Sequence, residues 1–302
     1  MDNSTKLQTK AELILLLMTF IWGSSFVISK ILLINISSIL YLIIRCLISI
    51  FILFIIFKKD IIQNFNLKNM LCGLFLGIPL AVGLILQNYG LQITTASKSA
   101  YLSSLMVIFA PIFQIIILKK RPSVGNFVGI VIVLIGIYFL TNPESSEINI
   151  GDLLNIIAAI LFGLYTVLLD KFSREINTSI LSLFQIMCTL LIGFLFLPFE
   201  KIKFDINANI VFGLLYMSIF ATVLTIWIQT NYQKFTTPTK AVIIFSIEPV
   251  IATIFASYIL NESFSTIETI GAICILFGIM ISELWETIFN YFKSSNKIIV
   301  ND

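Results

Sequence analysis

The chain has 302 residues, of which 58% are hydrophobic and only 12% charged, and its mean hydropathy is +1.03. A water-soluble globule does not carry this composition, so the sequence predicts an integral membrane protein. The net charge of +3 is small and its cations lie in short polar breaks, which argues against nucleic acid as a partner. The chain has no histidine, and its four cysteines form no CxxC pair. Neither a metal, a cofactor nor a disulfide is therefore expected.

Long apolar runs alternate with short polar breaks along the whole chain. The hydrocarbon core of a bilayer is about 30 Å thick and needs about 20 apolar residues per crossing helix, which leaves room for ten spans and no soluble domain. The polar N-terminal segment enters the first run without a cleavage pattern, so we expect it to be retained. The predicted fold is an all-α integral membrane protein with spans at residues 13–33, 39–57, 70–91, 100–118, 124–141, 153–170, 179–198, 209–230, 241–260 and 267–288.

The lysines and arginines divide unequally between the two sides of these spans. If the N-terminus is cytoplasmic, most of the 19 cations fall in cytoplasmic segments and few fall at the outer ends. Short cytoplasmic loops carry an excess of Lys and Arg, so this division favours that orientation. We therefore expect a multi-pass protein of the inner (cytoplasmic) membrane with both termini in the cytoplasm.

The two halves of the chain can be aligned on each other. At an offset of 140 residues "WG" at 22–23 meets "FG" at 162–163, and at 142 "TTASK" at 94–98 meets "TTPTK" at 236–240. Such matches, in the same order through both halves, indicate an internal duplication.

The predicted repeats are residues 1–143 and residues 144–302, each with five helices. Because five is odd, the second repeat must enter the membrane from the opposite face, which makes the repeats inverted. Inverted repeats are typical of alternating-access carriers, whose binding site lies near the middle of the membrane between the repeats.

Several stretches resemble a known family. They are "FIWGSSFVISK" in the first span, the arginine of "YLIIRCLIS", "SAYLSSLMVIFAPIFQIIILKKRPS", "IFSIEPVIATIFASYILNESFS" and "GAICILFGIMIS". The sequence is similar over residues 11–288 to the drug/metabolite transporter superfamily, and within it to the EamA-type ten-helix carriers. This resemblance implies a transporter of amino acids, related metabolites, nucleotide-sugars, vitamins or lipophilic drugs, often moved outward. One departure is "KKRP" in the first repeat, where many members have a glutamate like Glu262.

Glu248 is a carboxylate inside an apolar span, with Pro249 directly after it. It lies about eight residues, or roughly 12 Å, from the cytoplasmic end of its predicted helix. An ionised carboxylate there costs several kcal/mol unless it faces a polar cavity, is paired or takes up a proton. Pro249 lacks an N–H, which frees a backbone carbonyl one turn earlier. Two roles stay open: contact with substrate or a proton, and a structural hydrogen bond to a neighbouring helix.

Arg45 is the cation in the middle of a span and needs an anion. One candidate partner is Glu248 across a cavity. A second is a substrate carboxylate or phosphate, which the guanidinium can bind through two parallel hydrogen bonds. A third interpretation is that the side chain reaches the outer headgroups.

Other polar or aromatic side chains inside the spans complete the predicted substrate-binding set. Trp22 stands beside small hydroxyl residues and can form a stacking wall or a close helix contact. Serines in membrane helices often only bond their own backbone. No catalytic residue is expected. The remaining predicted substrate-binding residues are Ser25, Tyr101, Ser104, Tyr165, Gln185 and Ser246.

Glycines recur on two of the predicted spans, Gly125 and Gly129 on one and Gly271 and Gly278 on the other. They mark faces where backbones approach closely, either within one chain or in a homodimer.

The leading hypothesis is a secondary carrier of a small organic metabolite, an amino acid or related compound, moved outward by alternating access. Its expected partners are that solute and the lipid bilayer. An exporter of lipophilic drugs or cations is the alternative, against which Arg45 argues. An intramembrane enzyme is disfavoured because the chain has no histidine, no HExxH and no mid-span aspartate pair. A channel is disfavoured because no filter segment or charge ring is present.

Overall fold

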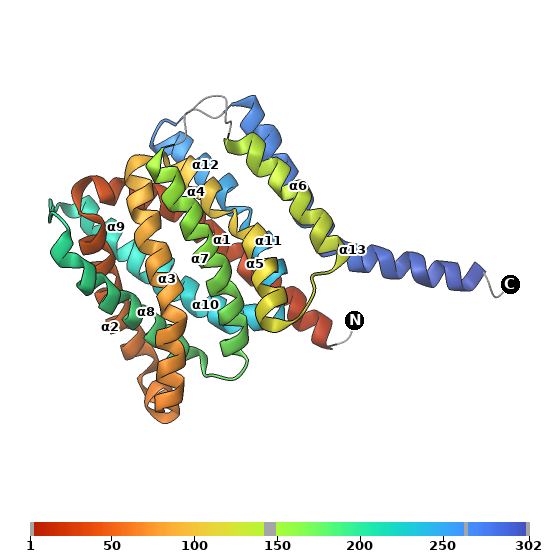
Figure 1. The fold of residues 1–302 in the computed structure, drawn as a ribbon, viewed down its shortest axis with the longest axis horizontal. Helices are drawn as coiled ribbons and strands as arrows, with labels where there is room; N and C mark the ends of the chain where they lie inside the picture. The colour runs from red at the N-terminus through yellow and green to blue at the C-terminus, as the bar shows by residue number, and fades with distance from the viewer. Residues whose placement is uncertain (1–2, 142–148, 263–264, 300–302) are drawn as a thin grey trace.

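The computed structural model describes residues 3–141, 149–262 and 265–299 of the chain, and nearly all of them are helical (Figure 1). Seven membrane crossings are single α-helices. Two short 3-10 turns are also present: η2 (Leu197–Phe199), and η4 (Gln233–Phe235) just after the predicted span at 209–230. The single helices are α1 (Asn3–Asn35), α2 (Ser38–Asn64), α3 (Leu67–Ile93), α6 (Val124–Thr141), α7 (Ile150–Ser173), α8 (Thr178–Phe196) and α13 (Thr266–Ile299). The backbone of α2 is kinked at Phe57, close to the end of its predicted span.

Three crossings are broken into pieces, although the sequence predicts continuous spans at 100–118, 209–230 and 241–260. The fourth consists of α4 (Ala96–Ser103), α5 (Met106–Phe113) and the π-helix η1 (Gln114–Leu118). The eighth consists mainly of α9 (Ala208–Ser218), the π-helix η3 (Ile219–Leu224) and α10 (Thr225–Tyr232). The ninth consists of α11 (Pro238–Phe245) and α12 (Glu248–Ile259). Hydropathy averaged over a span does not detect these breaks, because each crossing as a whole is apolar enough to span a membrane.

The lengths and hydropathies of the helices confirm the predicted fold class. Within the described residues, eight helical segments are long and apolar enough to cross a membrane. Two shorter apolar helices, Val124–Phe139 and Thr269–Ser282, correspond to the fifth and tenth predicted spans. The chain is therefore an all-α membrane protein.

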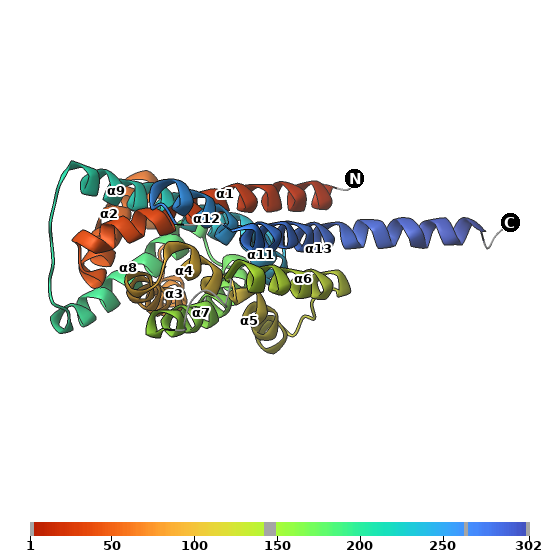
Figure 2. The ribbon, with the colours of Figure 1, turned by 90° about the horizontal axis from the view of Figure 1, so that it is seen from above.

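The contact between α6 and α13 shows that the repeats are inverted. A Cβ added to Gly129 would lie 2.8 Å from the carbonyl oxygen of Gly278, and one added to Gly136 would lie 2.7 Å from that of Gly271. Gly129 is equivalent to Gly271 and Gly136 to Gly278, so the two equivalent helices cross in opposite directions. These glycines thus pack within the chain, where α6 and α13 lie side by side in both views (Figures 1 and 2).

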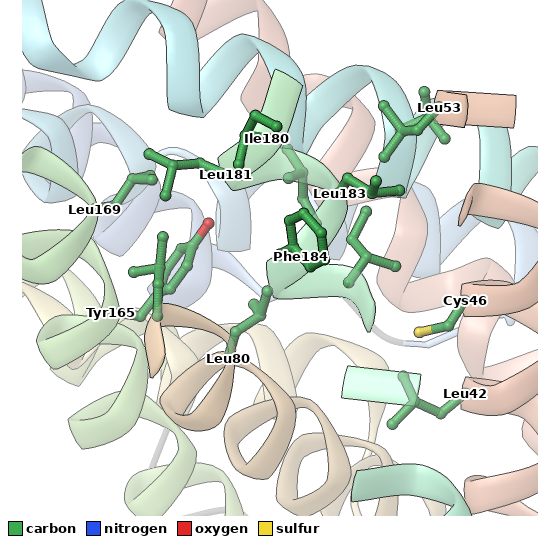
Figure 3. Packing of buried hydrophobic residues seen from close by; sticks show 14 of the residues in the cluster. Leu42, Cys46, Leu53, Leu80, Tyr165, Leu169, Ile180, Leu181, Leu183 and Phe184 are labelled. Carbon is green, nitrogen blue, oxygen red and sulfur yellow. The ribbon is translucent and has the colours of Figure 1, made fainter. Parts of the chain in front are cut away.

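The other helix contacts follow the same two-fold symmetry. The third crossing, α3, packs on α7 and α8 of the second repeat, and the eighth crossing packs on α1 and α2 of the first. The fourth crossing packs on α7, as the ninth does on α1. One hydrophobic core joins α2 and α3 to α7 and α8 (Figure 3).

Two of the breaks occur at equivalent serines. Ser104 lies between α4 and α5, and Ser246, at an offset of 142, lies between α11 and α12. Each hydroxyl donates to the carbonyl four residues earlier, Ser104 to Ala100 at 3.0 Å and Ser246 to Val242 at 2.9 Å. Such a bond competes with the helical ladder and bends helices, which is consistent with the interruption.

Candidate functional site

A cavity of about 100 Å³ lies between the two repeats. One water needs about 10–15 Å³, so the space suits several waters or a small solute. Four aromatic side chains, Trp22, Phe26, Phe162 and Phe245, form part of its wall. The rings of Trp22 and Phe245 meet edge to face, with centroids 5.2 Å apart. The polar and charged lining residues are Ser25, Ser29, Arg45, Gln87, Asn88, Ser103, Tyr165, Thr166, Gln229 and Glu248.

Most of the cavity wall is built from equivalent positions of the two repeats. The cavity therefore lies where the repeats meet, as alternating-access carriers with inverted repeats place their sites. The offset changes from 140 to 142 near η3, so the second repeat has two extra residues there, and the wider i→i+5 turns of a π-helix are a place where inserted residues can be accommodated. The equivalent pairs on the wall are Trp22 and Phe162, Ser25 and Tyr165, Phe26 and Thr166, Leu84 and Ile226, Gln87 and Gln229, Ser103 and Phe245, and Met106 and Glu248.

The charges break this symmetry. Arg45 has Gln185 as its counterpart, and Glu248 has Met106. The wall is thus symmetric in shape but carries its cation in the first repeat and its carboxylate in the second.

Arg45 is 8% exposed and is held by the eighth crossing. Its Nε donates to Thr222 Oγ1 at 2.5 Å, and its Nη2 donates to the carbonyl of Ala221 at 3.0 Å. Both acceptors lie in the π-helix η3. No described residue accepts from Nη1, so the end of the guanidinium formed by Nη1 and Nη2 keeps donors for a ligand.

The ion pair between Arg45 and Glu248, one of three predicted roles for the arginine, is not among the ion pairs of the described residues. The hydroxyl of Thr222 and a carbonyl of the π-helix take its place. Both acceptors are neutral, so neither of them balances the positive charge of Arg45, and an anion is still expected as its partner.

Glu248 is the first residue of α12 and is 9% exposed. Its carboxylate makes no hydrogen bond or ion pair with any described side chain or backbone group, and it lines the cavity. The N-terminal end of α12 carries a partial positive charge, which favours a carboxylate in the first turn. Pro249 stands in that first turn, where a missing N–H has no helical partner to lose.

Two further cavity side chains have buried polar atoms without partners. Asn88 Nδ2 is a donor and Gln229 Oε1 an acceptor, and neither has a hydrogen bond among the described residues. A buried polar atom without a partner costs about 1–3 kcal/mol, so such atoms are commonly satisfied by water or ligand. Arg45 and Glu248 offer a solute one donating and one accepting group, and the residues Asn88 and Gln229 add two polar atoms that are buried beside the cavity.

Five of the nine predicted substrate-binding residues line the cavity: Trp22, Ser25, Arg45, Tyr165 and Glu248. The hydroxyl of Ser25 donates to its own helix, at the carbonyl of Trp22 (2.7 Å). Tyr165 donates its hydroxyl to Gln185 Oε1 at 2.8 Å.

The other four predicted residues do not lie on the cavity wall. Ser104 and Ser246 bond their own helices at the breaks, and the Tyr101 hydroxyl pairs with that of Thr253. Gln185 is fully buried behind the wall, where it also donates to Thr230 at 3.3 Å. Gln185 therefore orients the cavity residue Tyr165 without reaching the cavity itself.

Six polar residues of the wall lie outside the predicted substrate-binding set. The repeat alignment contains a signal for part of this set, because "QN" at 87–88 meets "QT" at 229–230 at the offset of 142. Polar residues at matching positions of two apolar spans are good candidates for a shared cavity. The six residues are Ser29, Gln87, Asn88, Ser103, Thr166 and Gln229.

Comparisons with known proteins give the family. The EamA-like transporter family matches the chain twice, over residues 9–142 and 149–284. An uncharacterized transporter of Archaeoglobus fulgidus is 30% identical over 274 residues, which cover 91% of this chain and 86% of that protein. The uncharacterized transporter YoaV of Bacillus subtilis is 25% identical, with 90% of this chain and 96% of the relative covered.

One solved structure shares the fold. A protein crystal structure superimposes with a TM-score of 0.75 and 14% sequence identity, covering 92% of this chain and 97% of the other. The family and its relatives are transporters and not enzymes. The chain belongs to the EamA-like transporter family.

Proposed function

We propose that this protein is a secondary transporter that moves a small organic metabolite across the cytoplasmic membrane by alternating access. The observation that carries the proposal is the cavity shared by the two inverted repeats, with an incompletely bonded guanidinium and an unpartnered carboxylate in its wall. Charged groups inside a membrane protein are costly unless they serve a ligand, an ion or each other. Arg45 and Glu248 do not serve each other in this structure.

The chemistry of the wall favours an amino acid or a related compound as the solute. The free end of Arg45 suits the two oxygens of a carboxylate. Glu248 suits an ammonium group or a proton, and the aromatic wall suits an apolar side chain. Asn88 Nδ2 and Gln229 Oε1 add one donor and one acceptor.

The orientation is also part of the proposal. We place both termini in the cytoplasm because the polar breaks assigned to that side hold most of the 19 lysines and arginines. Outward movement of the solute is proposed together with this orientation.

Export of lipophilic cations is a second candidate function. The observation that favours it is the wall of Trp22, Phe26, Phe162 and Phe245 beside the Glu248 carboxylate, since aromatic faces attract cations. Arg45 in the same wall opposes it, because a cationic solute would be repelled by the guanidinium.

Thermal stabilisation of the detergent-purified protein by a panel of solutes tests these two proposals. A ligand that binds only the folded state increases the free energy of unfolding, by about 2.7 kcal/mol at a ligand concentration of a hundred times its Kd, and so raises the melting temperature. We expect amino acids or related zwitterions to raise it and Arg45→Ala to lose that shift. Stabilisation by lipophilic cations alone would contradict the metabolite proposal and support the second candidate.

A further inference from the structure

Two ion pairs join the repeats at opposite ends of the molecule. Lys98 Nζ lies 2.8 Å from Asp152 Oδ2, and Lys240 Nζ lies 3.5 Å from Glu12 Oε1. Lys98 is equivalent to Lys240 at the offset of 142, and Glu12 to Asp152 at 140. Each pair therefore connects the start of a broken crossing in one repeat to the start of the first crossing in the other.

The two carboxylates are held in place by further bonds. Asp152 Oδ2 accepts from the backbone N–H of Asn149 at 2.9 Å in a capping box. Glu12 Oε1 accepts from Thr236 Oγ1 at 2.9 Å and from Gln8 Nε2 at 2.8 Å. All four charged side chains of the ion pairs are at most 15% exposed, so solvent screens them less than it screens a surface pair.

A second polar contact reinforces each ion pair. Glu262 accepts from the backbone N–H of Ala96 at 3.0 Å and from Ser97 Oγ at 2.5 Å, at the start of α4. Gln114 Oε1 accepts from the backbone N–H and the hydroxyl of Thr239, at 3.0 and 2.9 Å, at the start of α11. Ser97 and Thr239 are equivalent. The counterpart of Glu262 in the first repeat is Lys120 of "KKRP", which cannot accept a hydrogen bond through its side chain. Gln114 makes the equivalent contact with the start of α11 instead.

The half-helices α4 and α11 connect these polar contacts to the cavity. Each has eight residues and ends at one of the equivalent serine breaks. The residues that flank the breaks line the cavity: Ser103 and Met106 on one crossing, Phe245 and Glu248 on the other. Ser103 lies five positions after Lys98, and Phe245 five positions after Lys240, which is about 7.5 Å along each half-helix.

We propose that the two ion pairs are latches that close the two ends of the cavity and are released in turn. Release of Lys98 from Asp152 frees α4 to swing about the Ser104 break, which opens the cavity at that end. Release of Lys240 from Glu12 frees α11 in the same way at the other end. In this structure both ion pairs are formed. The inference rests on the proposed function only in that the latches would serve the transport cycle. Whether the ion pairs hold the two ends can be measured without a transported solute.

Accessibility of a cavity thiol from each side of the membrane tests the latches. The four native cysteines are replaced, Ser25→Cys serves as the reporter, and a membrane-impermeant thiol reagent is applied from one side or the other. Two isosteric variants each neutralise one latch, Asp152→Asn and Glu12→Gln. We expect each to raise the labelling rate several-fold from one side only, with the two variants acting on opposite sides.

Matched controls remove other ion pairs near the same ends. Asp205→Asn loses the exposed pair with Lys203, and Asp170→Asn loses the pair with Arg174 at the C-terminal end of α7. Neither control should change labelling from either side. The latch proposal is overturned if the latch variants leave labelling unchanged, act equally from both sides, or match the controls. A second reporter, Gln87→Cys, repeats the measurement if Ser25→Cys disturbs folding. Labelling requires no solute, so these outcomes are separate from a failure of the transport proposal.

Discussion

Two pairs of equivalent elements differ in how they are held to the rest of the molecule: the long crossings α2 and α8, and the half-helices α4 and α11. In both pairs, polar or charged residues of the opposite repeat contact the starts of the helices. The long crossings run through their predicted spans without a break, and α2 is kinked only at Phe57, where its span ends. Carboxylates of opposite repeats cap their starts: Glu200 accepts from the backbone N–H of Ile39 at 3.0 Å, and Asp60 from Ser179 Oγ at 2.5 Å. A shared hydrophobic core runs between them (Figure 3). The half-helices are short and interrupted, and ion pairs join their starts to the opposite repeat.

This difference indicates which parts of the molecule are fixed and which can move. Lipid tails are as apolar as leucine, so close packing is a main force that holds helices together in a bilayer. Packing along the whole of α2 and α8, and along the glycine contact of α6 and α13, cannot be undone in one place. A single ion pair at the end of a half-helix can be broken locally, without separating helices that pack along their whole length.

The most severe loss is expected in the fixed part. Gly129→Leu puts a branched side chain where a Cβ alone would lie 2.8 Å from the carbonyl oxygen of Gly278. We expect α6 to separate from α13, with a loss of about 3 kcal/mol and of monodisperse protein in size-exclusion chromatography. Val131→Leu, at an exposed position of the same helix, is the matched control and should be neutral. Equal behaviour of the two variants would contradict the close glycine contact.

A smaller effect on folding and a large one on binding are expected at Arg45. Removing one partner of a desolvated charge pair costs about 2–5 kcal/mol, or roughly thirtyfold or more in affinity. Arg45→Ala should therefore lose affinity for carboxylate-containing solutes in a binding titration, and Arg45→Lys should lose less. An unchanged affinity in Arg45→Ala would exclude the guanidinium as the anion site.

Glu248→Gln tests the carboxylate without changing its shape. Glu248 has no polar partner among the described residues, so its protonation can respond to the solute and the medium. If it carries a proton during transport, the variant should bind solute but lose the pH dependence of uptake into proteoliposomes. Asp60→Asn, a carboxylate outside the cavity, should keep that dependence. A pH dependence that survives in Glu248→Gln would exclude Glu248 as the group that carries the proton.

The mildest change concerns the support behind the cavity wall. Tyr165→Phe removes the donor to Gln185 Oε1 and leaves a buried acceptor without that partner. We expect a loss of about 1–3 kcal/mol in stability, measured as a lower melting temperature, with a modest change in affinity. A melting temperature equal to that of the parent would show that the Tyr165–Gln185 bond adds no stability.

The sequence allowed the ten spans and the family to be predicted because both depend on hydropathy and on residues at matching positions. It did not reveal the breaks, because Ser104 and Ser25 look alike in a sequence, yet one bends a helix and the other lines the cavity. In a soluble helix the apolar face reveals the buried side. Here lipid-facing and core-facing positions are equally apolar, so the cavity face of each helix depends on its packing.

The roles proposed for Arg45 and Glu248 depend on the cavity between the repeats carrying a zwitterionic metabolite from one side of the membrane to the other. Counterflow in proteoliposomes loaded with such a solute measures this movement. Radiolabelled solute should accumulate with the parent protein and fail to accumulate with Arg45→Ala that is folded and reconstituted to the same level. Equal accumulation by the two proteins, or none by the parent with any solute that stabilises it, would refute the transport of a zwitterion through this cavity.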